Sequence, residues 1–177
     1  MTDEEKRARA RKTVFEFAHA YYRDITYRAG QIIPGADMKI PHLSYDEAEF
    51  FRTTMEPQEW LTMAEYGLGL RPNEDAAEMY EICQSMAEWM FAIPTMSAYH
   101  IPDIWYDTPM GALWAAAFVR VQGDELITIA EAAQIAGVSV QAISQRIDRG
   151  TLKAYTNPDA PNPRSERRLV RRGDVTK

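Results

Sequence analysis

The residues best suited to chemistry lie near the C-terminus, in a segment that we expect to be helical over residues 139–149. Ser139 can cap this helix and Gly150 can end it. At 100° per residue its apolar positions fall within about 60° of one another and should face the core: Val140, Ile143 and Ile147. The positions that then point away are Gln141, Gln145, Asp148 and Arg149. Gln can hydrogen-bond base edges and Arg can bind bases or phosphates, so this face could contact DNA, although a generic solvent-exposed helix could carry the same residues.

A shorter helix is expected directly before this one. Thr128 and Glu131 have the spacing of a capping box, and Gly137 ends the segment after barely two turns. Its apolar residues are Ala132, Ala133 and Ile135. Two short helices joined by a tight glycine turn are typical of a helix-turn-helix, whose second helix can lie in the major groove of DNA.

A β-hairpin is expected after the helices, over residues 151–170. Strand-forming residues flank a proline-rich loop at 157–163 and comprise Leu152, Ala154, Leu169 and Val170. Such a hairpin after a helix-turn-helix is called a wing. Its tip or returning strand carries arginines that could reach phosphate or a minor groove, namely Arg164, Arg167 and Arg168.

The stretch from Leu126 to Leu152 resembles the winged helix-turn-helix of phage excisionases and of mercury-resistance-type (MerR-like) regulators. The shared features are a hydroxyl-capped Glu-Ala-Ala helix, a Gly-Val-Ser turn, a second helix and an Arg-Gly-x-Leu exit into a basic wing. The resemblance covers under a third of the chain. The connection between the wing strands is unusually long and rich in proline, and Asp174 could cap the further helix that these proteins usually have after the wing.

This resemblance implies binding to double-stranded DNA and assigns roles to particular residues. Those directed toward bases are Ser139, Gln141, Ala142 and Gln145. Those directed toward phosphates are Arg146, Arg149, and the wing residues Lys153, Arg164, Arg167 and Arg168.

The charge distribution agrees with nucleic-acid contact at one end only. The 177-residue chain has a net charge of −6, but residues 1–123 carry 11 Lys and Arg against 19 Asp and Glu, whereas residues 124–177 carry 9 against 7. From Ser139 onward the count is 9 against 4. An acidic body with a basic C-terminal region predicts that anions are contacted by that region.

The remaining residues, 1–123, are expected to form an all-α bundle of four to five helices. Hydrophobic periodicity and capping residues place the helices at about residues 3–28, from a capping box at Ser44, from Pro57 to Gly67, at 73–93 and at 108–123. All four tryptophans and all nine methionines lie in this part. They could fill a core, line a small-molecule pocket, or form the interface of a homodimer or of a complex with another protein. The fold class is therefore mainly α, with a helical domain (1–123) and a winged helix-turn-helix module (124–177).

Other chemistry has weak support in the sequence. Glu16 and His19 form half of a di-iron motif, but the second Glu-x-x-His is missing, so we expect no metal and no cofactor. No phosphate-binding glycine loop, nucleophile elbow or Cys/His dyad is present, so we expect no enzyme. A basic run over residues 7–12 could touch DNA but is better interpreted as a solvated helix end.

The cellular setting follows from cysteine usage and hydropathy. The single cysteine, Cys83, cannot form an internal disulfide, and the N-terminus is too charged for a secretion signal. The longest apolar run, Ala112 to Val119, is far shorter than the roughly 20 residues of a membrane helix. We therefore expect a reduced, cytoplasmic protein without membrane contact.

The leading hypothesis is a prokaryotic or phage transcriptional regulator that reads the major groove with helix 139–149 and contacts phosphates or the minor groove with the wing. Two alternatives remain open. The protein could be an architectural or recombination-directionality factor of the excisionase type. It could also be an interaction module whose helix-turn-helix contacts a protein partner.

Overall fold

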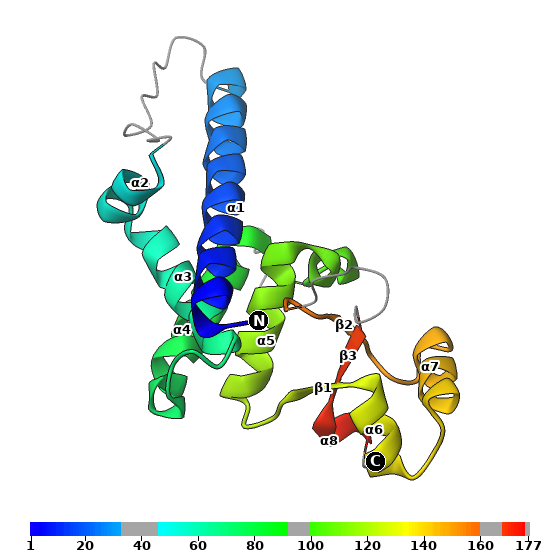
Figure 1. Ribbon diagram of the computed structural model, residues 1–177. Helices are drawn as coiled ribbons and strands as arrows, with labels where there is room; N and C mark the ends of the chain where they lie inside the picture. Colours follow the sequence, from blue (N-terminus) through cyan, green and yellow to red (C-terminus); the bar gives the residue numbers. More distant parts are fainter. Residues whose placement is uncertain (33–45, 92–99, 160–167, 176–177) are drawn as a thin grey trace.

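The fold was examined in a computed structural model, which describes residues 1–32, 46–91, 100–159 and 168–175 (Figure 1). The structure is mainly helical, with one small three-stranded antiparallel sheet. The α-helices are α1 (Asp3–Ile32), α2 (Glu47–Thr53), α3 (Met55–Gly67), α4 (Ala76–Phe91), α5 (Pro109–Val121), α6 (Ile129–Ala136), α7 (Val140–Asp148) and α8 (Arg172–Val175). Two 3-10 helices, η1 (Asn73–Asp75) and η2 (Asp103–Asp107), precede α4 and α5. The strands are β1 (Leu126–Thr128), β2 (Tyr155–Thr156) and β3 (Arg168–Arg171).

Helix α5 is the centre of the helical part, and α1, α3 and α4 pack around it. Its sequence is rich in alanine, so neighbouring backbones can approach closely, and nine of its 13 residues are buried. Thr108 caps the helix by accepting a hydrogen bond from Gly111 N. The indole of Trp114 donates a hydrogen bond of 3.0 Å to the carbonyl oxygen of Cys83 in α4, which satisfies its polar atom inside the core.

Several helix boundaries differ from those expected. Helix α1 continues through Gly30 to Ile32, because a single glycine lowers helix stability without ending a helix. The cap of α2 is Asp46, which accepts from Glu49 N, whereas the expected cap Ser44 lies outside the described residues. Asn73 begins one turn of 3-10 helix rather than α4 itself. No helix in the described ranges is long and apolar enough to cross a membrane.

The C-terminal elements form a second, separate core. Strand β3 is the middle strand of the sheet, with β1 on one side and β2 on the other. Helix α6 contacts β1 and β3, and α7 packs on α6. The buried residues of this second core are Ile127, Ala132, Ala133, Ile143, Leu152, Val170 and Val175. Strand β1 was not expected, since three residues give no periodic signal. The expected pairing across the hairpin exists, but β2 holds only Tyr155 and Thr156, so Leu152 and Ala154 lie before it.

Val140, which was expected to face the core, is largely exposed instead, and the apolar Ile135 of α6 is also exposed. Val140 has 50% of its surface exposed and Ile135 has 37%, whereas Ile143 is completely buried. The second core meets α7 from Ile143 onward, so the first turn of α7 extends beyond it. The prediction that Val140 faces the core was therefore wrong, because helical periodicity gives the direction of a side chain but not where the neighbouring elements end.

This difference can be tested by truncating the two side chains separately. We expect Ile143→Ala to lower the free energy of unfolding by about 2–5 kcal/mol, because it leaves a cavity in the second core. Val140→Ala, in the same helix, should change it by no more than about 0.5 kcal/mol. Urea denaturation followed by far-ultraviolet circular dichroism measures the free energy of unfolding of both variants. Equal losses for the two variants would place Val140 in the core after all.

Candidate nucleic-acid interface

The geometry of α6 and α7 is fixed by three local devices. Thr128 and Glu131 form a complete capping box, in which Glu131 N donates to Thr128 Oγ1 at 3.2 Å and Thr128 N donates to Glu131 Oε2 at 2.8 Å. These hydrogen bonds from Thr128 lower the pKa of the Glu131 carboxyl group. Gly137 adopts the left-handed conformation (φ 66°) that ends α6, and Ser139 then caps α7. All three features were predicted from the sequence and are confirmed.

The side of α7 opposite the core is polar and open to solvent. The exposed residues of this helix and its ends include Ser139, Gln141, Gln145, Asp148 and Arg149, whereas Ala142 and Arg146 are half-buried. The Ser139 hydroxyl accepts a hydrogen bond of 3.2 Å from Ala142 N, so its acceptor capacity is partly used inside the protein. Figure 1 shows α7 at the edge of the molecule, on the side away from α1 and α2. The face that could contact a large ligand is therefore unobstructed by the helical part.

Among the residues that the structure describes, most basic side chains of the C-terminal part are already paired with carboxylates. Arg168 binds Asp148 of α7 at 2.9 Å, and Arg171 binds Asp124 at 3.1 Å. Arg172 forms an ion pair with Glu125. By contrast, Arg146 and Arg149 make no ion pair with any residue that the structure describes. These two guanidinium groups are thus the basic groups on α7 that remain available for phosphate.

The residues assigned to the wing have different positions. Arg164 and Arg167 lie outside the described residues. Arg168 is exposed on β3, where its ion pair with Asp148 joins the hairpin to α7. Lys153 is directed toward the helical part, with its Nζ 3.7 Å from Asp103 Oδ1 and 3.9 Å from the centre of the Tyr106 ring. The structure thus brings Arg168 close to α7 and draws Lys153 away from it.

The contacts of Lys153 belong to a seam between the hairpin and the helical part, which the sequence analysis missed. Tyr155 of β2 packs against the helical core, and its ring meets that of Tyr106 edge-on, with centroids 5.8 Å apart. Thr156 and Asp107 are within 3.4 Å, and Lys6 forms an ion pair of 3.5 Å with Asp159. Burial raises the pKa of the Tyr155 phenol. The available sequence signal was Tyr155, an aromatic residue two positions after Lys153. That spacing does not identify Tyr106 and Asp103 as the partners.

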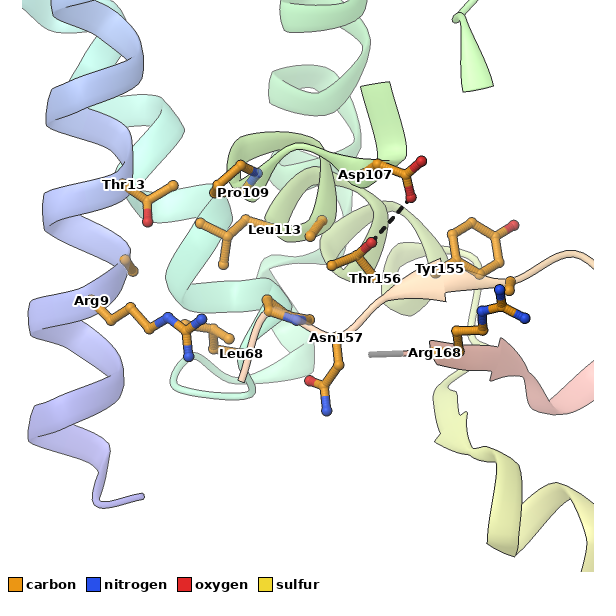
Figure 2. Close-up of a pocket in the computed structure, with 14 residues that line it drawn as sticks. Arg9, Thr13, Leu68, Asp107, Pro109, Leu113, Tyr155, Thr156, Asn157 and Arg168 are labelled. Atoms are coloured by element: carbon orange, nitrogen blue, oxygen red, sulfur yellow. Dashed lines mark hydrogen bonds between the residues drawn. The ribbon is translucent and has the colours of Figure 1, made fainter. Parts of the chain in front are cut away.

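A cleft of about 600 Å³ opens along this seam, between α1, α5 and β2 (Figure 2). Its floor is apolar and includes Leu68 and Leu113, while Arg9, Asp107 and Arg168 are at its edges. The volume lies in the range of small-molecule sites. Asp107 is hydrogen-bonded to Thr156 and Arg168 is paired with Asp148, so these two charged groups of the cleft already have partners within the protein.

The other candidate residues of the N-terminal part have ordinary structural surroundings. His19 packs against the rings of Phe15 and Phe50. Within the described residues, no group of three His, Cys, Asp or Glu side chains is placed to hold a metal ion. In the basic run, Arg11 pairs with Glu47 and Lys12 lies 3.9 Å from Glu16. Cys83 is buried, which raises the pKa of its thiol to about 12 and makes the reactive thiolate rare.

Comparisons of the chain with protein-family models, with curated proteins and with solved structures found no match.

The seam can be tested by removing the side chain that crosses it. We expect Tyr155→Ala to lower the free energy of unfolding by about 1–3 kcal/mol, because it removes a half-buried aromatic contact between the hairpin and the helical core. Thr156→Ala is the matched control in the same strand, since its 3.4 Å contact with Asp107 is worth about 0.5 kcal/mol or less at an exposed site. Urea denaturation measures both variants. If Tyr155→Ala and the parent chain had the same free energy of unfolding, the seam would contribute no measurable stability to the fold.

Proposed function

We propose that this chain is a sequence-specific double-stranded DNA-binding protein, and that its α6–turn–α7 unit acts as a helix-turn-helix with β2 and β3 as the wing. The observation that carries the proposal is the division of α7 into two faces. Ile143 is buried in the second core, while Gln141, Gln145 and Arg149 are exposed at the edge of the molecule. A helix that projects from the surface with amide and guanidinium groups can enter the major groove, where these groups pair with base edges.

The charge pairing indicates which contacts would supply affinity. Arg146 lies in the last turn of α7 and Arg149 is its C-cap, and neither makes an ion pair among the described residues, so they could bind phosphates without first breaking an ion pair. Arg168 would contribute less in this state, because Asp148 already compensates its charge. The excess of acidic residues in 1–123 would repel DNA and leave the C-terminal part as the contact surface.

The helical part would serve to bring two copies together as a homodimer. A single small module buries a limited area on DNA, and two half-sites multiply the sequence information that is read. Large apolar side chains remain exposed on the helical part, among them Trp89 (53%) and Tyr80 (41%) of α4, and such residues are enriched in protein interfaces. In this arrangement the protein would act as a prokaryotic or phage transcriptional regulator.

The proposal is tested by fluorescence anisotropy with DNA selected by the full chain from a random-sequence pool. We expect a preferred site and an affinity that falls steeply as salt rises, since phosphate contacts release counterions. The double variant Gln141→Ala/Gln145→Ala should lose most of the preference for that site over random DNA, because each bidentate base contact contributes about 1–3 kcal/mol of discrimination. Gln134→Ala, an exposed glutamine of α6, is the matched control and should retain it.

The outcomes separate the possible functions. Absence of binding even at low salt would contradict the proposal and favour contact with a protein partner. Binding that bends DNA through successive copies, without effect on a promoter, would favour an architectural or recombination role. If the double glutamine variant kept its preference for the selected site over random DNA, Gln141 and Gln145 of α7 would not be the residues that read bases.

The assignment of phosphate contacts makes a separate prediction. Arg149→Met should reduce the slope of log affinity against log salt by about 1, because one phosphate contact is lost. Lys153→Met should leave the slope unchanged, because the Lys153 ammonium group is held by Asp103 and the Tyr106 ring. The slopes come from anisotropy titrations at several salt concentrations. If Lys153→Met flattened the slope of log affinity against log salt, Lys153 would contact phosphate after all.

A further inference from the structure

Three exposed aliphatic side chains lie within six residues of one another, at the end of α6, in the turn and at the start of α7. The exposed fractions are 37% for Ile135, 44% for Val138 and 50% for Val140. None of the three belongs to the second core or to the partly buried residues packed against it. Val140 opens α7, and Ile135 and Val138 precede it, so a ligand bound at the N-terminal end of α7 would cover apolar surface there, which is favourable.

In the proposed DNA complex, a DNA base would be the group that covers Val140. Val140 is the first residue of the helix, directly after the Ser139 cap and directly before the exposed Gln141. In a helix-turn-helix, the N-terminal residues of the second helix contact base edges. One base pair presents an apolar group in the major groove, since thymine carries a C5-methyl group there and the other bases do not.

We propose that Val140 is a specificity-determining residue that packs its isopropyl group against the C5-methyl group of a thymine in the DNA site. This inference rests on the proposed function, which it deepens by naming one base. The adjoining Gln141 and Gln145 hydrogen-bond neighbouring base edges, so the site contains a thymine next to the bases that these glutamines read.

The size of the patch favours a base over a protein surface. A standard protein interface buries about 800 Å² on each partner, which is far more than three partly exposed aliphatic side chains provide. The residues around Val140 are also those of a nucleic-acid surface, with amides at Gln141 and Gln145 and a guanidinium at Arg149 on the same helix. A methyl-sized contact fits one exposed valine.

The test replaces thymine by deoxyuridine, which lacks only the C5-methyl group, at one position at a time in the selected DNA site. For the parent chain, we expect one position in each half-site at which the replacement weakens binding about fourfold, the value for one buried methyl-sized group. For Val140→Ala, the same replacement should have no effect at that position. Ile104→Ala truncates an aliphatic side chain that is 74% exposed in η2, far from α7 in the sequence, and should keep the fourfold loss.

The possible results distinguish the methyl contact of Val140 from the proposed DNA-binding function. A deoxyuridine penalty that vanishes only in Val140→Ala supports the methyl contact. Normal DNA binding with no sensitive thymine, or with a penalty that persists in Val140→Ala, overturns the contact and leaves the proposed function standing. Absence of DNA binding by the parent chain overturns both. If Val140→Ala loses only binding to a protein partner, the patch is a protein-docking surface. Circular dichroism of each variant shows that the fold is retained.

Discussion

The C-terminal part depends on the pairing of β3 with both of its neighbours. Leu169 lies opposite Thr128 of β1 and also opposite Tyr155 of β2, so one residue fixes the chain before α6 and the chain after α7. Val170, which is completely buried, anchors this strand in the second core. A shift of β3 by one residue would turn its buried side chains to the opposite face. The place where α6 starts and the direction in which α7 leaves the core therefore both follow from a strand of four residues.

The same strand determines how the hairpin meets the rest of the molecule. Because β2 pairs with β3, Tyr155 is held where it can pack against Tyr106 and the helical core. Arg168 of β3 holds Asp148 at the other end of the strand pair, and Arg171 holds Asp124 before β1. The exposed Arg168–Asp148 pair contributes little stability by itself, whereas the aromatic contact buries apolar surface. The hairpin thus connects α7 to the helical part, and the two parts are in direct contact along the seam.

Features that depend on residues close together in the sequence were predicted, whereas contacts between residues far apart in the sequence were not. The capping box at Thr128, the left-handed Gly137 and the Ser139 cap depend on residues three or four apart, and they occur where their spacing indicated. Strand β1 pairs with residues more than forty positions later, and Tyr155 packs on a helix fifty positions earlier, so no short pattern could show either. Val140 was misplaced for a related reason, since its exposure depends on where α6 and the sheet end. At the candidate site, the polar positions of α7 could be read from periodicity, whereas the ion pairs that occupy Arg168 and Lys153 could not.

If the chain binds DNA as proposed, these ion pairs would shift the balance between nonspecific affinity for phosphate and selectivity for bases. The salt-dependent part of DNA affinity grows with the number of phosphates that are neutralised, with a slope of about −0.9 for each. Counting basic residues from Ser139 onward suggests a strongly basic region, yet among the described residues only Arg146 and Arg149 of this region are without an ion pair. Ion pairs within the protein lower what Lys153, Arg168, Arg171 and Arg172 would contribute to nonspecific contact with phosphate, and the acidic body would lower it further. In the proposed DNA complex, selectivity would then come from the bases that α7 contacts and from the pairing of two copies, rather than from phosphate contacts of these four residues.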